Sequence, residues 1–166
     1  MDTFYEQIIK IKMNGKAKAM IAAIIIVDLF VVLGLLWLSL FTAPAIAFLV
    51  IVGAVWGGYK LITMLSVEFE YIFTNGDLDV DKITARSSRK RMVSINCGKV
   101  EKMGEFKGQP APGSVKETFV YCNPDDEGQI YLIAKDRNRG QIMLVIAPDE
   151  RIREAIEKAV PRLAKY

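Results

Sequence analysis

The sequence predicts a membrane-anchored α+β protein, in which a hairpin of two apolar helices precedes a domain of seven antiparallel strands and one C-terminal helix. Residues 19–59 carry a single charged side chain, Asp28, whereas residues 66–166 carry 17 Lys or Arg and 16 Asp or Glu. The second region also alternates between apolar and polar residues, with turn residues between the runs. The composition of 52% hydrophobic and 25% charged residues therefore averages two pieces, one suited to lipid and one to water.

The first element that we expect is a short amphipathic helix within residues 1–18. Thr3 and Glu6 have the spacing of a capping box, and apolar residues such as Phe4 and Ile8 recur at helical spacing. Lys10 and Lys12 flank this apolar face. The segment is expected either to lie in the cytoplasmic headgroup region or to pack on the soluble domain.

Two apolar runs, residues 19–41 and 45–65, form the predicted transmembrane hairpin. Each is long enough to cross a hydrocarbon layer of about 30 Å at about 1.5 Å per residue. Pro44 follows a very short connection and opens the second helix. Lysines flank the hairpin on its two open ends and are absent from its turn, which predicts an inner (plasma) membrane protein with both termini in the cytoplasm.

Two sets of residues in the hairpin are candidates for a specific role. Asp28 and Lys60 fall at similar depth when the chain folds back at residue 43, so they are a candidate intramembrane pair with either a functional or a structural role. Close helix packing is predicted for the small residues of the second span, either within the hairpin or against another protein. These helix-packing candidates are Gly53, Ala54, Gly57 and Gly58.

The strands of the domain expected over residues 66–166 are predicted from the alternation of apolar and polar residues. Asn75 and Gly76 supply a two-residue turn between the first two strands, and the predicted helix begins at Pro148 and Asp149. Ile152, Ile156, Val160 and Leu163 are its expected buried face. The seven predicted strands, all antiparallel, cover residues 67–74, 78–84, 91–95, 99–106, 117–122, 129–135 and 141–146, and form a curved sheet or open barrel capped by the helix.

The residues from Glu70 to Ile83, together with Arg89-Lys90-Arg91 and Val100-Glu101, give the chain a family resemblance. The layout resembles uncharacterised bacterial two-helix membrane proteins with a pleckstrin-homology-like (PH-like) cytoplasmic domain. The resemblance implies a PH-like fold and a membrane location, and it implies no reaction. The lipid specificity of eukaryotic relatives is not carried over, because the first hairpin turn here is short and acidic.

Enzymatic chemistry is not predicted. The 166 residues include no histidine, which excludes His-dependent bases and nucleophile pairs, and no phosphate-binding or nucleophile-elbow motif is present. The two cysteines, Cys97 and Cys122, are interpreted as core thiols, since without histidine they cannot complete a four-ligand zinc site. We expect no catalytic residue, no metal and no cofactor.

Charged residues in the domain suggest where it binds. Asp77, Asp79 and Asp81 lie on one face of a strand and lack the remaining positions of a calcium loop, so a solvated face is expected. Asp81 is expected close to Arg91 across the next hairpin. The basic residues of this hairpin are therefore expected to be charge-matched and solvated, and contact with anionic lipid or an acidic partner is a second interpretation of this basic cluster. The domain charge of +1 argues against binding of nucleic acid. The cluster comprises Arg86, Arg89, Lys90 and Arg91.

The function that follows is a non-enzymatic integral membrane protein. Its cytoplasmic PH-like domain is expected to bind a protein partner or anionic lipid headgroups. An accessory or structural subunit of a membrane complex, recognised through the transmembrane hairpin, is the alternative.

Overall fold

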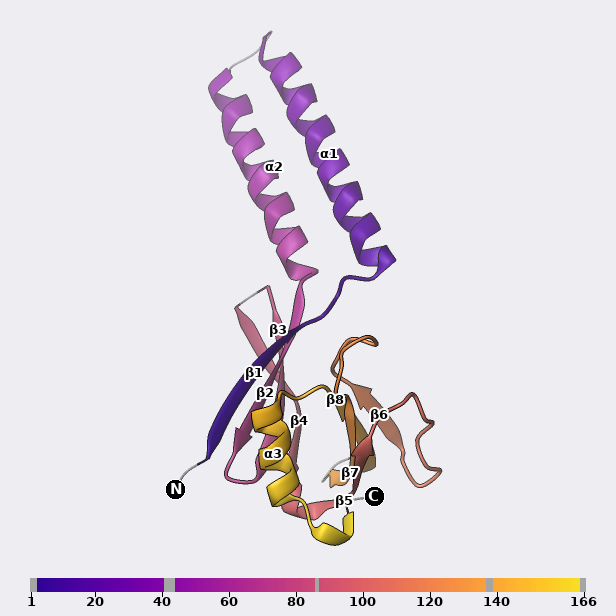
Figure 1. Cartoon of the computed structure of the whole chain (residues 1–166). Helices are drawn as coiled ribbons and strands as arrows, with labels where there is room; N and C mark the ends of the chain where they lie inside the picture. The colour runs from indigo at the N-terminus through magenta and orange to yellow at the C-terminus, as the bar shows by residue number, and fades with distance from the viewer. Residues whose placement is uncertain (1–2, 41–43, 86, 137–138, 165–166) are drawn as a thin grey trace. The chain divides into compact units, whose positions relative to one another are not determined.

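The computed structural model of the chain describes residues 3–40, 44–85, 87–136 and 139–164. It divides into two compact units. One unit, Lys12–Val67 with Thr84–Ser87, contains the helical hairpin, and the other, Met1–Ile11 with Glu68–Ile83 and Ser88–Tyr166, contains the strands and the C-terminal helix (Figure 1).

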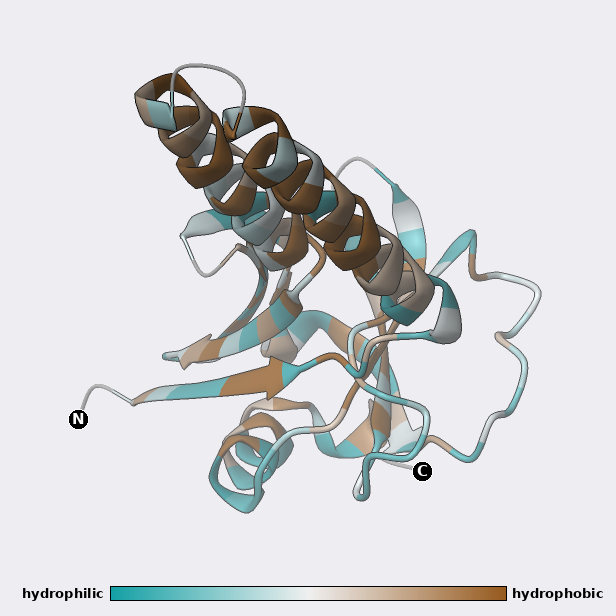
Figure 2. Cartoon of the chain, turned by 90° about the horizontal axis from the view of Figure 1, so that it is seen from above, coloured by the Kyte–Doolittle hydropathy of each residue, from teal (hydrophilic) through white to brown (hydrophobic). Residues whose placement is uncertain are grey.

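The hairpin consists of α1 (Gly15–Ser39) and α2 (Pro44–Met64). Both helices are long and apolar enough to cross a membrane, with mean hydropathies of 2.9 and 1.9, and hydrophobic residues recur along their whole length (Figure 2). Helix α1 begins four residues before the predicted span because Asn14 caps it, its side chain accepting a hydrogen bond from the backbone N–H of Ala17 at 2.8 Å.

The predicted N-terminal helix is wrong, because this segment is a strand. β1 (Phe4–Lys10) pairs antiparallel with β2 (Val67–Thr74) from Phe4 opposite Thr74 to Lys10 opposite Glu68. Side-chain hydrogen bonds join it to later parts of the domain. The Gln7 side chain accepts from the N–H of Asp149 at 2.7 Å, and the Asn123 amide donates to the carbonyl of Lys10 at 3.0 Å. The segment thus packs on the domain, which was the other expectation.

The first sheet has the order β1-β2-β3-β4, in which β3 is Asp77–Thr84 and β4 is Ser88–Asn96. Asn75 and Gly76 form the turn between β2 and β3, both at positive φ, as the sequence predicts. Tyr71 and Phe73 of β2 and Leu78 of β3 face the core. The first sheet therefore contains one more strand than expected, since β1 completes it.

The second sheet has the order β5-β7-β8-β6. Its strands are β5 (Val100–Glu105), β6 (Glu117–Val120), β7 (Ile130–Asp136) and β8 (Gly140–Ile146), and a short 3₁₀ turn, η1 (Cys97–Lys99), leads into β5. The single seven-stranded antiparallel sheet is therefore replaced by two four-stranded sheets, and among the described residues no closed barrel forms.

One strand pair is parallel, contrary to the prediction. β6 runs parallel to β8, with Phe119 opposite Leu144. The physical reason is the long connection between β5 and β6. Two strands of a sheet that run in the same direction can be joined only by such a crossover connection. This connection also covers the outer face of the second sheet, where Ala111 and Val115 pack against the buried side chains of Met143 and Val145.

Helix α3 (Glu150–Ala159) closes the core between the sheets, as predicted. The Asp149 side chain caps it by accepting from the N–H of Ile152 at 2.9 Å. Ile152, Ile156 and Val160 are buried, but Leu163 is fully exposed, so its assignment to the buried face is wrong. The reason is that α3 ends at Ala159 before Pro161, and the 3₁₀ turn η2 (Arg162–Ala164) buries Ala164 instead.

Candidate functional site

The arginines of the predicted basic cluster are engaged by carboxylates of the first sheet. Arg91 forms ion pairs with Asp79, at 2.5 Å from Nη1 to Oδ2, and with Asp81, as predicted for Asp81. Arg89 Nη1 lies 2.8 Å from Glu70 Oε2. Arg86 lies outside the residues that the structure describes.

These contacts engage two of the three basic residues of the cluster that the structure describes. Lys90 is exposed and, among the described residues, forms no ion pair. The aspartates differ in exposure, because Asp77 is exposed whereas Asp81 is 7% exposed. The expectation of a uniformly solvated acidic face is therefore wrong for Asp81, which the Arg91 side chain covers.

Glu70 is the most unusual carboxylate of this cluster, since its side chain is 0% exposed. Its contact with Arg89 is an ion pair without hydrogen-bond geometry, and Arg89 is itself 58% exposed. Burial raises the pKa of Glu70, the neighbouring carboxyl group of Glu6 on β1 raises it further, and Arg89 lowers it. Glu70 and Glu6 were missed as site residues because the segment containing Glu6 was assigned to a helix.

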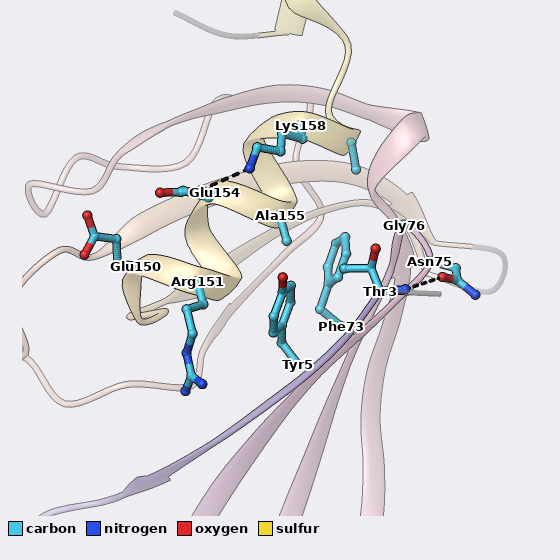
Figure 3. Close-up of a pocket in the computed structure, with 11 residues that line it drawn as sticks. Thr3, Tyr5, Phe73, Asn75, Gly76, Glu150, Arg151, Glu154, Ala155 and Lys158 are labelled. Carbon is cyan, nitrogen blue, oxygen red and sulfur yellow. Dashed lines mark hydrogen bonds and ion pairs between the residues drawn. The ribbon is translucent and has the colours of Figure 1, made fainter. Parts of the chain in front are cut away.

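A second candidate surface is a groove between β1, the turn after β2, and α3, which we call the α3 groove (Figure 3). It encloses about 580 Å³. Tyr5 and Phe73 form its aromatic floor and Ala155 lines its helical side. Glu154 and Lys158 form an ion pair of 3.1 Å at its rim. The sequence did not predict this groove, because Tyr5 reaches it only as part of a strand.

In the hairpin, the structure does not bring Asp28 and Lys60 together as an ion pair among the described residues. Asp28 packs against Gly58 of α2, where an added Cβ would lie 2.8 Å from Asp28 Cγ and closer still to Oδ2. Lys60 Nζ lies 5.8 Å from the centre of the Trp56 ring. A functional role for either charge stays a prediction.

The small residues of α2 fall into two groups. Gly58 is buried and Ala54 is half-buried, so these two residues take part in packing within the hairpin. By contrast, an added Cβ at Gly53 or Gly57 would meet no atom within 4 Å. Gly53 is exposed and Gly57 is half-buried, and the space beside both glycines is open.

The two cysteines are free and buried. Burial raises the pKa of Cys97 to about 12 and that of Cys122 to about 11. Both thiols are therefore protonated near neutral pH. Among the residues that the structure describes, no group of three or more Cys, Asp or Glu side chains is placed to hold a metal ion.

Comparison with known families gives a match that covers almost the whole chain. Residues 1–165 match the family model described as Bacterial PH-like domain (DUF6106). The match includes β1 and the hairpin as well as the later strands. Comparisons with curated proteins and with solved structures find no match. The chain therefore belongs to the bacterial PH-like domain family DUF6106.

Proposed function

We propose that the protein is a non-enzymatic, membrane-anchored binding module whose PH-like domain contacts a protein partner on the cytoplasmic side. PH-like domains are in general binding modules without catalytic activity, which supports the absence of a reaction. The two apolar helices support the anchor.

The observation that carries the choice of a protein partner is the internal neutralisation of the basic cluster. A surface that binds anionic headgroups gains about 1 kcal/mol from each cation free to approach them. Arg89 and Arg91 instead contact three carboxylates, on Glu70, Asp79 and Asp81. Of the three cations of the cluster that the structure describes, Lys90 alone is therefore left unpaired and available to a lipid surface.

The α3 groove is the contact surface that we propose for the partner. Its aromatic floor and polar rim match the composition that protein interfaces use, with a buried apolar centre and charged residues around it. Glu154 and Lys158 are 58% and 78% exposed on their side chains, so both are accessible to a partner.

Photocrosslinking of the full-length protein in its native membrane tests this function. A photoreactive residue replaces Arg151, which lines the α3 groove, and a matched control replaces Lys107, an exposed residue after β5 that does not line it. We expect discrete protein adducts from position 151 and fewer from position 107. Adducts with lipid alone at position 151 would contradict the proposal.

A charge-exchange variant makes this test specific to the groove. Glu154→Lys combined with Lys158→Glu keeps the ion pair across one helical turn and the net charge, so the stability of α3 changes by only a few tenths of a kcal/mol. The variant reverses the pattern of charge at the rim. We expect the adducts from position 151 to decrease, with no change in the amount of folded protein.

A role as accessory subunit of a membrane complex is the second candidate, and the open space beside Gly53 and Gly57 favours it. Small residues on a free helix face allow another helix to approach closely. Crosslinks from position 53 to a different membrane protein would support this role. Crosslinks confined to α1 of the same chain would contradict it.

A further inference from the structure

A second groove, which we call the β4 groove, runs along the free edge of the first sheet. It has a volume of about 540 Å³, and six consecutive residues of β4, from Arg91 to Asn96, line it. β4 is the last strand of its sheet and, within the described ranges of the chain, pairs only with β3. Successive side chains of a strand point to opposite faces of the sheet. Because consecutive residues line the groove, the edge of β4 with its main chain borders it, and not one face alone.

The opposite wall is also the end of a strand. Pairing between β5 and β7 ends at Val100 and Ala134, so Lys135 and Asp136 of β7 extend beyond β5. Ala134, Lys135 and Asp136 line the groove. The groove is therefore an elongated gap between two strand segments that belong to different sheets.

Cations outnumber acids around the gap by four to two, with Arg91, Lys99, Lys135 and Arg139 against Asp77 and Asp136. Lys99 and Lys135 are exposed and, within the described part of the chain, form no ion pair. The guanidinium of Arg139 lies 4.9 Å from the centre of the Phe119 ring and is also unpaired by acid among the described side chains. Of the two acids, Asp77 accepts a hydrogen bond from the Asn96 amide at 2.6 Å, and Asp136 accepts one from the N–H of Arg139 at 2.9 Å.

We propose that the β4 groove binds an extended, acidic segment of a partner protein, which adds to β4 as a further strand. Main-chain hydrogen bonds to the edge supply affinity, and Lys99, Lys135 and Arg139 select acidic side chains. This inference rests on the proposed function as a protein-binding module and names a site on it. The site is separate from the α3 groove, with which it shares no lining residue.

Peptide binding to the full-length protein in nanodiscs tests the inference. The probe is an eight-residue peptide that alternates Glu with Val or Thr and carries a fluorophore. Two control peptides replace Glu by Lys, or carry N-methyl groups on alternate amides so that the same charges cannot pair as a strand. We expect binding of the first peptide only, at micromolar to millimolar concentration.

Protein variants locate the binding. Lys99→Glu with Lys135→Glu reverses two groove charges, and Lys102→Glu with Lys116→Glu makes the same change in net charge at two exposed lysines that line neither groove. We expect the groove variant to bind at least about tenfold more weakly, and the control variant to bind within about twofold of the unmodified protein. All four lysines are exposed, so both variants are expected to retain the thermal transition of the unmodified protein.

Three outcomes would overturn the inference: no binding at millimolar concentration, equal binding of the N-methylated peptide, or equal loss of binding in the two variants. Photocrosslinking from position 151 separates these outcomes from a failure of the proposed function. If protein adducts persist there while the peptide does not bind, the β4 groove is not the site and the binding module stands. If neither is observed, both proposals fail.

Discussion

Glu70 shows how the fold changes the chemistry of a single residue. The side chain is fully covered beside Arg89, and Glu6 arrives next to it only because β1 pairs with β2. The alternation of β2 predicts on which face Glu70 lies. It does not predict burial, because the cover is supplied by side chains from two other strands.

The raised pKa of Glu70 predicts how stability depends on pH. Because folding raises this pKa above its ordinary value of 4.5, the folded state holds the proton more tightly than the unfolded state. The stabilisation is complete below pH 4.5 and is lost as the pH rises through the raised pKa. Glu70→Gln keeps a neutral side chain, so we expect thermal unfolding to vary less with pH above 4.5 than in the unmodified protein. An identical pH dependence in the two proteins would contradict the assignment.

The buried cysteines predict slow thiol chemistry. With pKa values of about 12 for Cys97 and about 11 for Cys122, thiolate is scarce at pH 8, and burial blocks access as well. We expect alkylation of both residues to follow unfolding, at least about a hundredfold slower than in denaturant. Mass spectrometry of samples treated with iodoacetamide measures this rate, and rapid labelling of native protein would contradict the burial.

At the scale of single elements, the pairing of α1 with α2 depends on close contact at Gly58. An added Cβ at Gly58 would lie 2.8 Å from Asp28 Cγ, whereas one at Gly53 would meet nothing within 4 Å. We expect Gly58→Ala to destabilise helix pairing by about 1–3 kcal/mol and Gly53→Ala to leave it unchanged. Asp28→Ala is expected to relieve the effect of Gly58→Ala. Crosslinking yield between α1 and α2 in micelles measures the pairing, and equal effects of the two alanines would contradict this packing.

β1 illustrates where an element can be predicted and where it cannot. Its residues alternate, with Tyr5, Gln7 and Ile9 facing the domain, yet the same segment also contains a capping-box spacing that favours a helix. Pairing with β2 decides between these patterns, and the partner strand begins only at Val67, beyond the hairpin. Local sequence carries no signal for so distant a pairing.

Other elements followed from local signals. The turn at Asn75 and Gly76, the strands on either side of it, and the cap of α3 at Asp149 all depend on neighbouring residues. The direction of β6 and the division into two sheets depend on where a long connection crosses, which no short motif encodes. The two grooves were missed for the same reason, since each joins elements that are distant in sequence.

At the scale of the whole molecule, the hairpin is an insertion within the PH-like domain. Lys10 and Glu68 are paired on adjacent strands although residues 11–67 separate them. If α1 and α2 both cross the membrane, their open ends must emerge on the same side, because β1 and β2 belong to one sheet. This pairing supports the placement of both open ends on one side of the membrane, independently of the distribution of lysines.

An insertion can be removed, which gives a prediction for the isolated domain. Replacing residues 12–66 by Asn-Gly joins Ile11 to Val67 through a two-residue turn that fits the register of β1 and β2. We expect a soluble protein that unfolds cooperatively in urea. A chain beginning at Val67 lacks Tyr5 and Ile9, which pack on the core, and is expected to be at least about 2 kcal/mol less stable. Equal stability of the two would contradict the role of β1.

Labelling of single introduced cysteines in intact cells tests most directly whether the membrane hairpin holds one folded module on the cytoplasmic side. Lys10→Cys, Pro44→Cys and Ser114→Cys are treated with a maleimide that does not cross the inner membrane, and the buried native thiols give little background. We predict labelling from outside at position 44 alone, with positions 10 and 114 labelled only after the membrane is opened. Labelling of position 114 from outside, or of positions 10 and 114 from opposite sides, would contradict the account.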